Sequence, residues 1–525
     1  MVEEHNSTKI VSRIDIIEKK LDFFTRNTVL SLFIISSIGL FLRLYYFPYN
    51  VSLTLDALEF FFYATDTSIL GRLPTNFSFA NNGWPIFLSF FFSIFRFDNA
   101  LDYMTLQRVI AISISVLTII PVYCLCNRFF DKPYAIVGAA IFAFEPRIIQ
   151  NSILGLTEPL YIMLVTLALV LFLSPKRKMT YSSFGVVAFS SLVRAEGLFV
   201  FFPLLIMFFV RYRKERKIIA KCILVTSIFI LLVLPMAVFR IQTQGNDALT
   251  SRILEETNNV LTTSSDGSEL FTYLIAAVEN FVKFSGWSLI PIFIFFVPLS
   301  LFLIFRKRTQ DNIIIIIVII SMILPVFYAF SVAPDTRYIY PLFPLFCVLS
   351  IMTVKRLGNK IKNRNIFLIL IICGVLLSSS IFLDFKKYDY EHQREAFGIA
   401  HYVTSIAKAV NDYYPEDTYL IVDEIPEKWP VLKSSIPFQT SIIPTHDFDS
   451  LEKYVEFSKN KGLTHLVLDG NQNRPYFLND VFYHEEKYPY LIKELDSWNH
   501  GFKYHIKIYK IDYYRFDSII NNNLE

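Results

Sequence analysis

The chain has 525 residues, of which 54% are hydrophobic and only 18% are charged, and its mean hydropathy is +0.44. A soluble globular chain carries about 25% charged residues, so this composition excludes an ordinary soluble protein and indicates a membrane protein. The net charge of +4 is small, and the basic residues lie between apolar runs, which argues against nucleic-acid binding.

Eleven apolar runs each approach the ~20 residues that a bilayer core requires. They cover residues 29–47, 105–126, 133–150, 158–174, 180–194, 197–211, 218–240, 287–305, 312–333, 338–354 and 365–384. A further stretch, 84–95, is too short to cross and predicts a re-entrant or interfacial helix. All five cysteines lie inside apolar runs, so no disulfide framework is expected.

The loop charges predict the topology. The segments that would face the cytoplasm hold 23 Lys and Arg residues, whereas the outer loops hold 8. This imbalance predicts a cytoplasmic N-terminal segment at 1–28 and a transmembrane domain at 29–385, whose first outer loop is 48–104. Because the span count is odd, residues 386–525 are predicted to lie outside, and the protein to be a multi-pass cell-membrane protein.

Residues 386–525 have a soluble texture in which helices alternate with short apolar strands, and this predicts a small α/β domain. The helices are expected at 392–413, 447–461 and 486–496, and the strands at 418–424, 464–470 and 504–511. The run at 469–473 predicts a turn after a strand. The predicted fold class is therefore an α-helical polytopic membrane protein with a C-terminal extracytoplasmic α/β domain.

Three carboxylates follow the first span, in the first outer loop. In a helix, Asp56 and Glu59 would share one face at i and i+3, and Asp66 lies further along. Acidic residues held at a bilayer boundary are costly unless they serve a site or reach water. The pair is thus a candidate for base or metal-ligand chemistry, and the alternative is a solvated cap after the span.

The other outer loops also carry charges. For any single loop, the alternative to a site is a helix-end charge at the interface, and this alternative is favoured for Glu145 and Glu196. Their joint placement on one side of the membrane nevertheless predicts a shared cavity. The residues are, in chain order, Glu145, Arg147, Glu158, Arg194, Glu196, Asp335 and Arg337.

Several stretches together resemble the GT-C superfamily of polytopic glycosyltransferases, over roughly residues 29–384. The similarity is to the branch of protein mannosyltransferases, aminoarabinose transferases and rhizobial lipopolysaccharide glycosyltransferases. It rests on the acidic first loop, the short helix that begins with GWP, and the motifs GLTEPLY (155–161), RAEGL (194–198) and DTRYIYPLFP (335–344). The family usually has an adjacent Asp-Glu pair, whereas two residues separate Asp56 from Glu59. The WWDYG motif of oligosaccharyltransferases is absent from the sequence.

The resemblance implies transfer of a sugar from a polyprenyl-phosphate donor to a protein, lipid or glycan acceptor at the outer face. Asp56 matches the catalytic acidic residue of the family, and its carboxylate would act as the general base. The leaving phosphate calls for Arg337 and Arg194, with Arg147 behind them, or for a metal ion. Asp56 and Glu158 could supply oxygen ligands to magnesium or manganese. A single base favours inversion at the anomeric carbon.

Two other classes of function stay open. A secondary transporter also has many spans and buried charges, although its marks are internal repeats and broken helices with ionisable residues at the midplane. A non-enzymatic membrane scaffold that presents the α/β domain is the third reading. The sequon at Asn76 lies on the predicted outer side and could itself be glycosylated.

Overall fold

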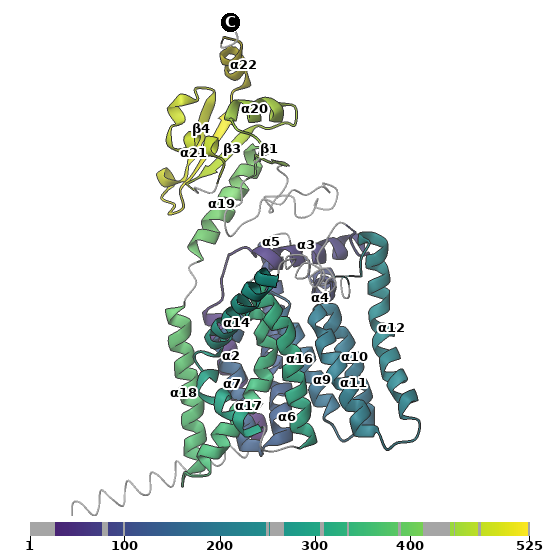
Figure 1. Cartoon of the computed structure of the whole chain (residues 1–525). Coiled ribbons are helices and arrows are strands. Elements are labelled where there is room, and N and C mark those ends of the chain that lie inside the picture. Colours follow the sequence, from purple (N-terminus) through teal and green to yellow (C-terminus); the bar gives the residue numbers. More distant parts are fainter. Residues whose placement is uncertain are drawn as a thin grey trace, which may run out of the picture. The chain divides into compact units, whose positions relative to one another are not determined.

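The fold is taken from a computed structural model, which describes residues 27–75, 82–97, 100–247, 251, 267–304, 309–332, 335–386, 390–412, 441–445, 447–470 and 474–522. The chain divides into two compact units, and Figure 1 shows their helices and strands. The first unit comprises Met1–Phe47, Leu73–Phe90 and Gln107–Lys387. The second comprises Pro48–Arg72, Phe91–Leu106 and Tyr388–Glu525. The predicted sequon at 76–78, the predicted strand at 418–424 and most of the segment 1–28 lie outside the described residues.

The first unit is helical. Its helices, two of which (α4 and α5) are shared with the second unit, are α2 (Thr28–Tyr45), α4 (Gly83–Ile94), α5 (Ala100–Leu117), α6 (Ile119–Phe129), α7 (Lys132–Phe144), α8 (Pro146–Ser152), α9 (Glu158–Phe172), α10 (Arg177–Val193), η1 (Ala195–Gly197), α11 (Leu198–Tyr212), α12 (Ile218–Gln244), α14 (Gly267–Leu289), α15 (Phe293–Ile304), α16 (Gln310–Val332), η2 (Thr336–Leu342), α17 (Phe343–Gly358) and α18 (Arg364–Phe385).

Helix α7 lies at the centre of this unit, since α2, α6, α17 and α18 all pack against it. Its side chains from Tyr134 to Phe144 are all buried. The neighbouring helix α2 contributes a fully buried cation, Arg43, whose three side-chain nitrogens all donate hydrogen bonds. The acceptors are backbone carbonyls and serine hydroxyls on α2, α5, α7 and α8. These bonds satisfy a charge that would otherwise be costly inside a membrane.

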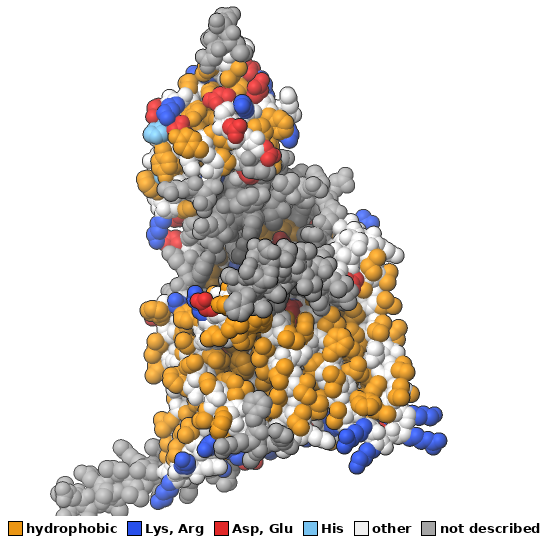
Figure 2. Space-filling model, viewed as in Figure 1, with side chains coloured by type: hydrophobic (Ala, Val, Ile, Leu, Met, Phe, Trp, Pro, Cys, Tyr) orange, Lys and Arg blue, Asp and Glu red, His pale blue; other side chains and the backbone are white. Residues whose placement is uncertain are grey.

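Seven helical stretches within the described residues are long and apolar enough to cross a membrane. They are Thr28–Tyr45, Ala100–Phe129, Ala195–Tyr212, Ile218–Gln244, Gln310–Phe327, Thr336–Gly358 and Arg364–Phe385. Apolar side chains cover the flank of the first unit, as a lipid-facing surface requires, and Lys and Arg gather at the ends of its helices (Figure 2). A polytopic helical membrane protein was predicted, and this part of the prediction is confirmed.

The eleven predicted runs all fall on helices, but their lengths differ from the prediction. The run 133–150 is interrupted at Glu145 and Pro146, where α7 ends and α8 begins. The run 287–305 is also broken, because α14 ends at Leu289 and α15 continues at an angle of 113°. Pro291 lies in that break and has no N–H to continue the helical ladder. Helices α7 and α9 are apolar but short, so a count of eleven spans stays a prediction.

The second unit contains helix α3 (Leu55–Leu70) and a five-stranded sheet. The strand order is β2-β1-β3-β5-β4, from β1 (Ala409–Asn411), β2 (Ser441–Ile443), β3 (His465–Asp469), β4 (Leu491–Asp496) and β5 (Ile506–Ile511). Strand β1 is parallel to β2 and β3, whereas β5 is antiparallel to β3 and β4.

Alternation along β3 explains how the sheet is covered. Leu466 and Leu468 belong to one apolar cluster, and Val467 belongs to another. Successive strand residues point to opposite faces, so the sheet has an apolar core on each side. Helices α20 (Leu451–Lys459), α21 (Tyr476–Tyr483) and α22 (Tyr513–Asn522) contribute to the first cluster, and α19 (Glu391–Ile406) contributes to the second. A small C-terminal α/β sheet region was predicted, and it is present.

Some predicted elements of this region were wrong. The stretch 486–496 was expected to be a helix, but it contains a short 3-10 turn (Glu485–Lys487) followed by edge strand β4. Pro489 opposes a helix there, and pairing with β5 stabilises the strand instead. The helix expected at 392–413 ends at Ile406, and its last residues form β1. Tertiary pairing decided both cases.

Candidate functional site

Arg337 lies on η2, the short 3-10 helix that opens the last but one long apolar stretch. The Asp335 side chain accepts a hydrogen bond from the Arg337 backbone N–H at 2.9 Å and pairs with its Nε at 2.5 Å. Both side chains are about one-third exposed. The Asp335 carboxylate therefore caps η2 and holds the guanidinium of Arg337, whose side chain is partly exposed.

Arg194 is the centre of a buried charge cluster. Its Nη1 donates to Glu158 Oε1 at 2.6 Å, and its Nη2 donates to Glu196 Oε1 at 2.8 Å. The Glu158 side chain is 1% exposed and stands in the first turn of α9. On the other side, the guanidinium lies 5.2 Å from the ring centre of Tyr338, which belongs to η2. Two carboxylates and an aromatic ring thus fix this cation in one position.

Arg147 binds backbone carbonyls at the break between two helices. Its Nη2 donates to the Trp287 carbonyl at 2.6 Å and its Nε to the Ile290 carbonyl at 3.3 Å, at the break between α14 and α15. A cation near the last carbonyls of a helix is favourable, because the helix dipole is negative there. Arg147 also interacts with Tyr340 of η2. Its guanidinium is thus largely occupied with structural partners.

These contacts make η2 the meeting point of the arginines singled out in the sequence. Tyr338 faces Arg194, Tyr340 faces Arg147, and Arg337 belongs to η2 itself. The three come from loops that are about 50 to 190 residues apart in the chain. The structure therefore brings together the charged residues of three predicted outer loops.

The GWP motif at the start of α4 holds two of these loops. Trp84 is fully buried, and its Nε1 donates to the Gly155 carbonyl at 3.1 Å, where Gln107 Nε2 also donates at 2.8 Å. Gly83 lies against the backbone of Leu192 and Val193, and a Cβ there would stand 2.8 Å from three of their backbone atoms. The motif thus fixes the turn before Glu158 and the end of α10 before Arg194.

The carboxylates of the first loop lie on α3, in the second unit. Asp56 stands in the first turn of α3 and is exposed, as is Glu59 one turn later. Desolvation by the surrounding protein atoms, and then the neighbouring Asp56 carboxylate, raise the pKa of Glu59. The predicted helical pair is therefore present, and its members are close enough to interact. Asp66 lies two turns further on and is buried.

Glu145 lies between the end of α7 and the start of α8. It is completely buried, and its Oε1 caps α8 by accepting from the Arg147 backbone N–H at 3.3 Å. Among the residues that the structure describes, no three His, Cys, Asp or Glu side chains are arranged to hold an ion. The two oxygens of Glu158 contact Arg194 and Asn151.

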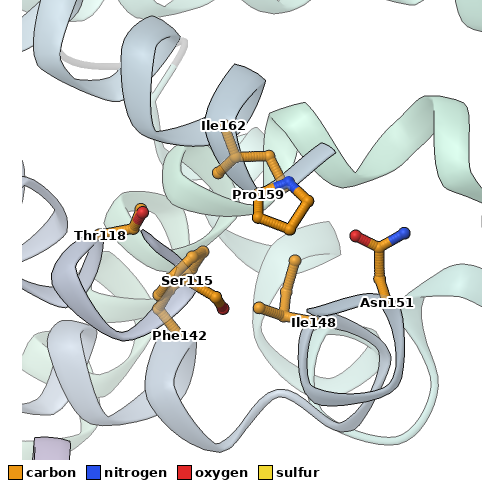
Figure 3. A pocket seen from close by; sticks show the side chains of 7 residues that line it. All are labelled: Ser115, Thr118, Phe142, Ile148, Asn151, Pro159 and Ile162. Carbon is orange, nitrogen blue, oxygen red and sulfur yellow. The ribbon is translucent and has the colours of Figure 1, made fainter. Parts of the chain in front are cut away.

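A pocket in the first unit is a second place to consider (Figure 3). Its lining residues come from α5, the junction between α5 and α6, α7, α8 and α9, and are Ser115, Thr118, Phe142, Ile148, Asn151, Pro159 and Ile162. Figure 3 shows these side chains around the pocket, and the space between them is too narrow for a water molecule. It cannot accommodate a sugar, and we do not regard it as a substrate site.

The sequence analysis missed the polar residues that lie inside predicted spans. Arg43 joins four helices, and Arg108 Nε donates to the Ile153 carbonyl at 3.1 Å, next to the turn held by Trp84 and Gln107. Polar side chains inside a membrane segment are rare and usually have a partner. Their position within apolar runs was the signal that could have marked them.

Comparison with known proteins identifies the family. The sequence pattern of a family described as predicted membrane protein (DUF2079) matches residues 99–432. The chain belongs to this family. No curated protein matches the sequence.

Solved structures show the fold of this family member. The Archaeoglobus fulgidus oligosaccharyltransferase, in complex with Zn and sulfate, has a TM-score of 0.57 at 14% identity, over 83% of this chain and 68% of that chain. ArnT from Cupriavidus metallidurans, bound to undecaprenyl phosphate, has a TM-score of 0.57 at 11% identity, over 92% and 97%. The archaeal enzyme, named AglB, was also solved with an inhibitory peptide and a dolichol-phosphate (TM-score 0.53, 14% identity, 84% and 69%). The predicted GT-C fold is confirmed.

Proposed function

We propose that the protein is an integral-membrane glycosyltransferase that takes a sugar from a polyprenyl-phosphate-linked donor. The acceptor would be a protein, a lipid or a glycan at the outer face of the membrane. The observation that carries the proposal is the convergence of Arg194, Arg337 and Arg147 on η2, within a GT-C fold. The neighbours of that fold include structures with undecaprenyl phosphate and dolichol-phosphate.

The arginines have different roles in this proposal. Arg337 is accessible, and its planar guanidinium can donate to two phosphate oxygens at once. Arg194 is held by Glu158 and Glu196, so it would add positive charge near the phosphate while the carboxylates keep it in place. Arg147 supports the α14–α15 break and would act as a positioning residue rather than as a ligand.

Asp56 is the proposed base. Its carboxylate takes the proton of an acceptor hydroxyl or amine while the acceptor atom attacks the anomeric carbon. The bond between that carbon and the phosphate oxygen breaks, and the polyprenyl phosphate leaves with the bonding electrons. Arg337 stabilises the negative charge that develops on the leaving group. One base suffices for this step, which inverts the anomeric centre, and Glu59 would support Asp56.

The arrangement in the membrane is part of the proposal. The segment 1–28 would be cytoplasmic, 29–385 would form the transmembrane domain, and 386–525 would lie outside, as the loop charges predict. The bent pair α14–α15 is a feature that transporters also show, but a second such pair is not present among the described residues. The glycosyltransferase proposal therefore accounts for more of the observations than a transporter does.

The test is to incubate the purified protein with a panel of polyprenyl-phosphate sugars and acceptors, and to follow the release of polyprenyl phosphate. Asp56→Asn keeps the shape and loses the base, so turnover should fall by ~10²–10⁴-fold. Asp102→Asn is the matched control, since Asp102 is also an exposed acid in the second unit. Near-normal turnover in the Asp56 variant would remove it from the mechanism. Failure to release polyprenyl phosphate from any donor would contradict the proposed function.

A further inference from the structure

A dense group of basic residues lies at one end of the first unit, where α9 joins α10 and α11 joins α12. It has nine basic members, and one acidic residue, Glu215, lies among them. We call it the basic patch, and it comprises Lys176, Arg177, Lys178, Arg211, Arg213, Lys214, Arg216, Lys217 and Lys221. Figure 2 shows Lys and Arg side chains gathered at the ends of α11 and α12.

Specific contacts hold the two turns of the patch together. Arg211 donates to the carbonyls of Phe172 at 2.6 Å and Ser174 at 3.0 Å, so the end of α11 is tied to the end of α9. Glu215 pairs with Arg177 at 2.6 Å and also with Lys221, which ties the start of α10 to the start of α12. These contacts hold the two turns that carry the cations next to each other.

Most of these cations have no carboxylate partner in the part of the chain that the structure describes. Seven of them are exposed, and six of these seven form no ion pair with another residue that the structure describes. These six are Lys176, Lys178, Arg213, Lys214, Arg216 and Lys217. Like charges that are concentrated on a fixed surface raise the local potential and attract anions. The patch thus lacks the anionic partner that its charge requires.

The surroundings of the patch indicate where that partner is. Helices α11 and α12 are both long and apolar enough to cross a membrane, and the patch lies at their joined ends. Large apolar side chains next to it are exposed, among them Phe209, Val210, Ile219 and Ile223. Cations that follow a lipid-facing surface lie at the level of the phospholipid headgroups.

We propose that the basic patch binds the headgroups of anionic phospholipids in the adjacent leaflet. The phosphate groups of these lipids would bridge the α9–α10 and α11–α12 turns and hold the two helix pairs together. This inference does not depend on the proposed glycosyltransferase activity, because the patch shares no residue with the site at η2. It adds a lipid-binding site to the protein.

The experiment uses the full-length protein, delipidated in neutral detergent. Binding of phosphatidylglycerol and of phosphatidylcholine is counted by native mass spectrometry at increasing lipid concentration. We expect wild type to prefer phosphatidylglycerol, and a variant with Arg213, Lys214, Arg216 and Lys217 changed to Gln to bind it at least ~10-fold more weakly. Lys176→Gln with Lys178→Gln is a second, milder variant in the same patch, and its affinity should lie in between.

The matched control changes four exposed basic residues at the α17–α18 turn, Arg356, Lys360, Lys362 and Arg364, to Gln. It removes the same charge and should leave the preference within about twofold of wild type, since the effect is local to the patch. Wild-type lipid binding in both patch variants would overturn the proposal, as would an equal loss in the control. Competition by soluble glycerol 3-phosphate at lipid-like concentrations would also overturn it, because a soluble anion would then be the ligand.

Discussion

Gly83 provides a sharp test of how the GWP motif positions the charged loops. Replacing it by Ala adds a methyl group 2.8 Å from the backbone carbon and oxygen of Leu192 and from the backbone nitrogen of Val193. Ordinary van der Waals contact begins at about 3.4 Å, so the two backbones must separate by about 0.6 Å. Backbone atoms cannot rotate away as a side chain can. Arg194, the next residue, would move away from Glu158.

The magnitude follows from two opposing terms. Overpacking of this kind costs about 1–3 kcal/mol. Ala at a helical position would otherwise gain about 0.5–1 kcal/mol over Gly. We therefore expect a net loss, seen as a fall of about 2–5 °C in the temperature at which the detergent-solubilised protein loses its monodisperse state.

Gly374→Ala in α18 is the control for this experiment. A Cβ at Gly374 would meet no atom within 4 Å, so this variant should be as stable as wild type or slightly more stable. Thermal stability is measured by size-exclusion chromatography of heated samples of all three proteins. If Gly83→Ala matched Gly374→Ala, α4 would not be packed against the end of α10, and the positioning role of the motif would be refuted.

Three further predictions concern other parts of the chain. A cysteine at exposed Asn460 should react with a membrane-impermeant reagent on intact cells, and labelling only after permeabilisation would contradict the predicted outer location. Arg337→Lys should weaken donor use far more than thermal stability, because an ammonium cannot hold two phosphate oxygens; unchanged use would leave only the capping role. Glu485 is partly buried, but hydrogen bonds from Lys493 and Tyr509 hold its pKa at about 2. The stabilising contribution of the Glu485 carboxylate is present above about pH 4.5 and is lost as the pH falls toward 2. The C-terminal region of the E485Q variant should therefore lose less of its protease resistance on acidification than that of wild type.

The membrane class and the helical segments could be predicted because they depend on local composition. An apolar run near twenty residues long has few alternatives to a helix in lipid, since each backbone polar group must bond within its own segment. Strand β3 was found for a similar reason, because HLVLD is short, apolar and bounded by turn residues. Strand β4 was missed because its identity depends on β5, and pairing between separate segments is not visible in the local pattern.

The candidate site, too, could be predicted from the sequence only in part. The sequence by itself determined which residues carry charge next to the ends of apolar runs, and so it singled out Arg194, Arg337 and Arg147. Local partners such as Asp335 and Glu196 lie two residues away in the same loops, but only the tertiary structure brought Glu158 and Tyr338 to Arg194 and the Trp287 carbonyl to Arg147. It left Arg337 accessible, held Arg194 between two carboxylates and placed Arg147 against the carbonyls of a broken helix. A side chain's charge is a property of its residue, whereas its partners are a property of the fold.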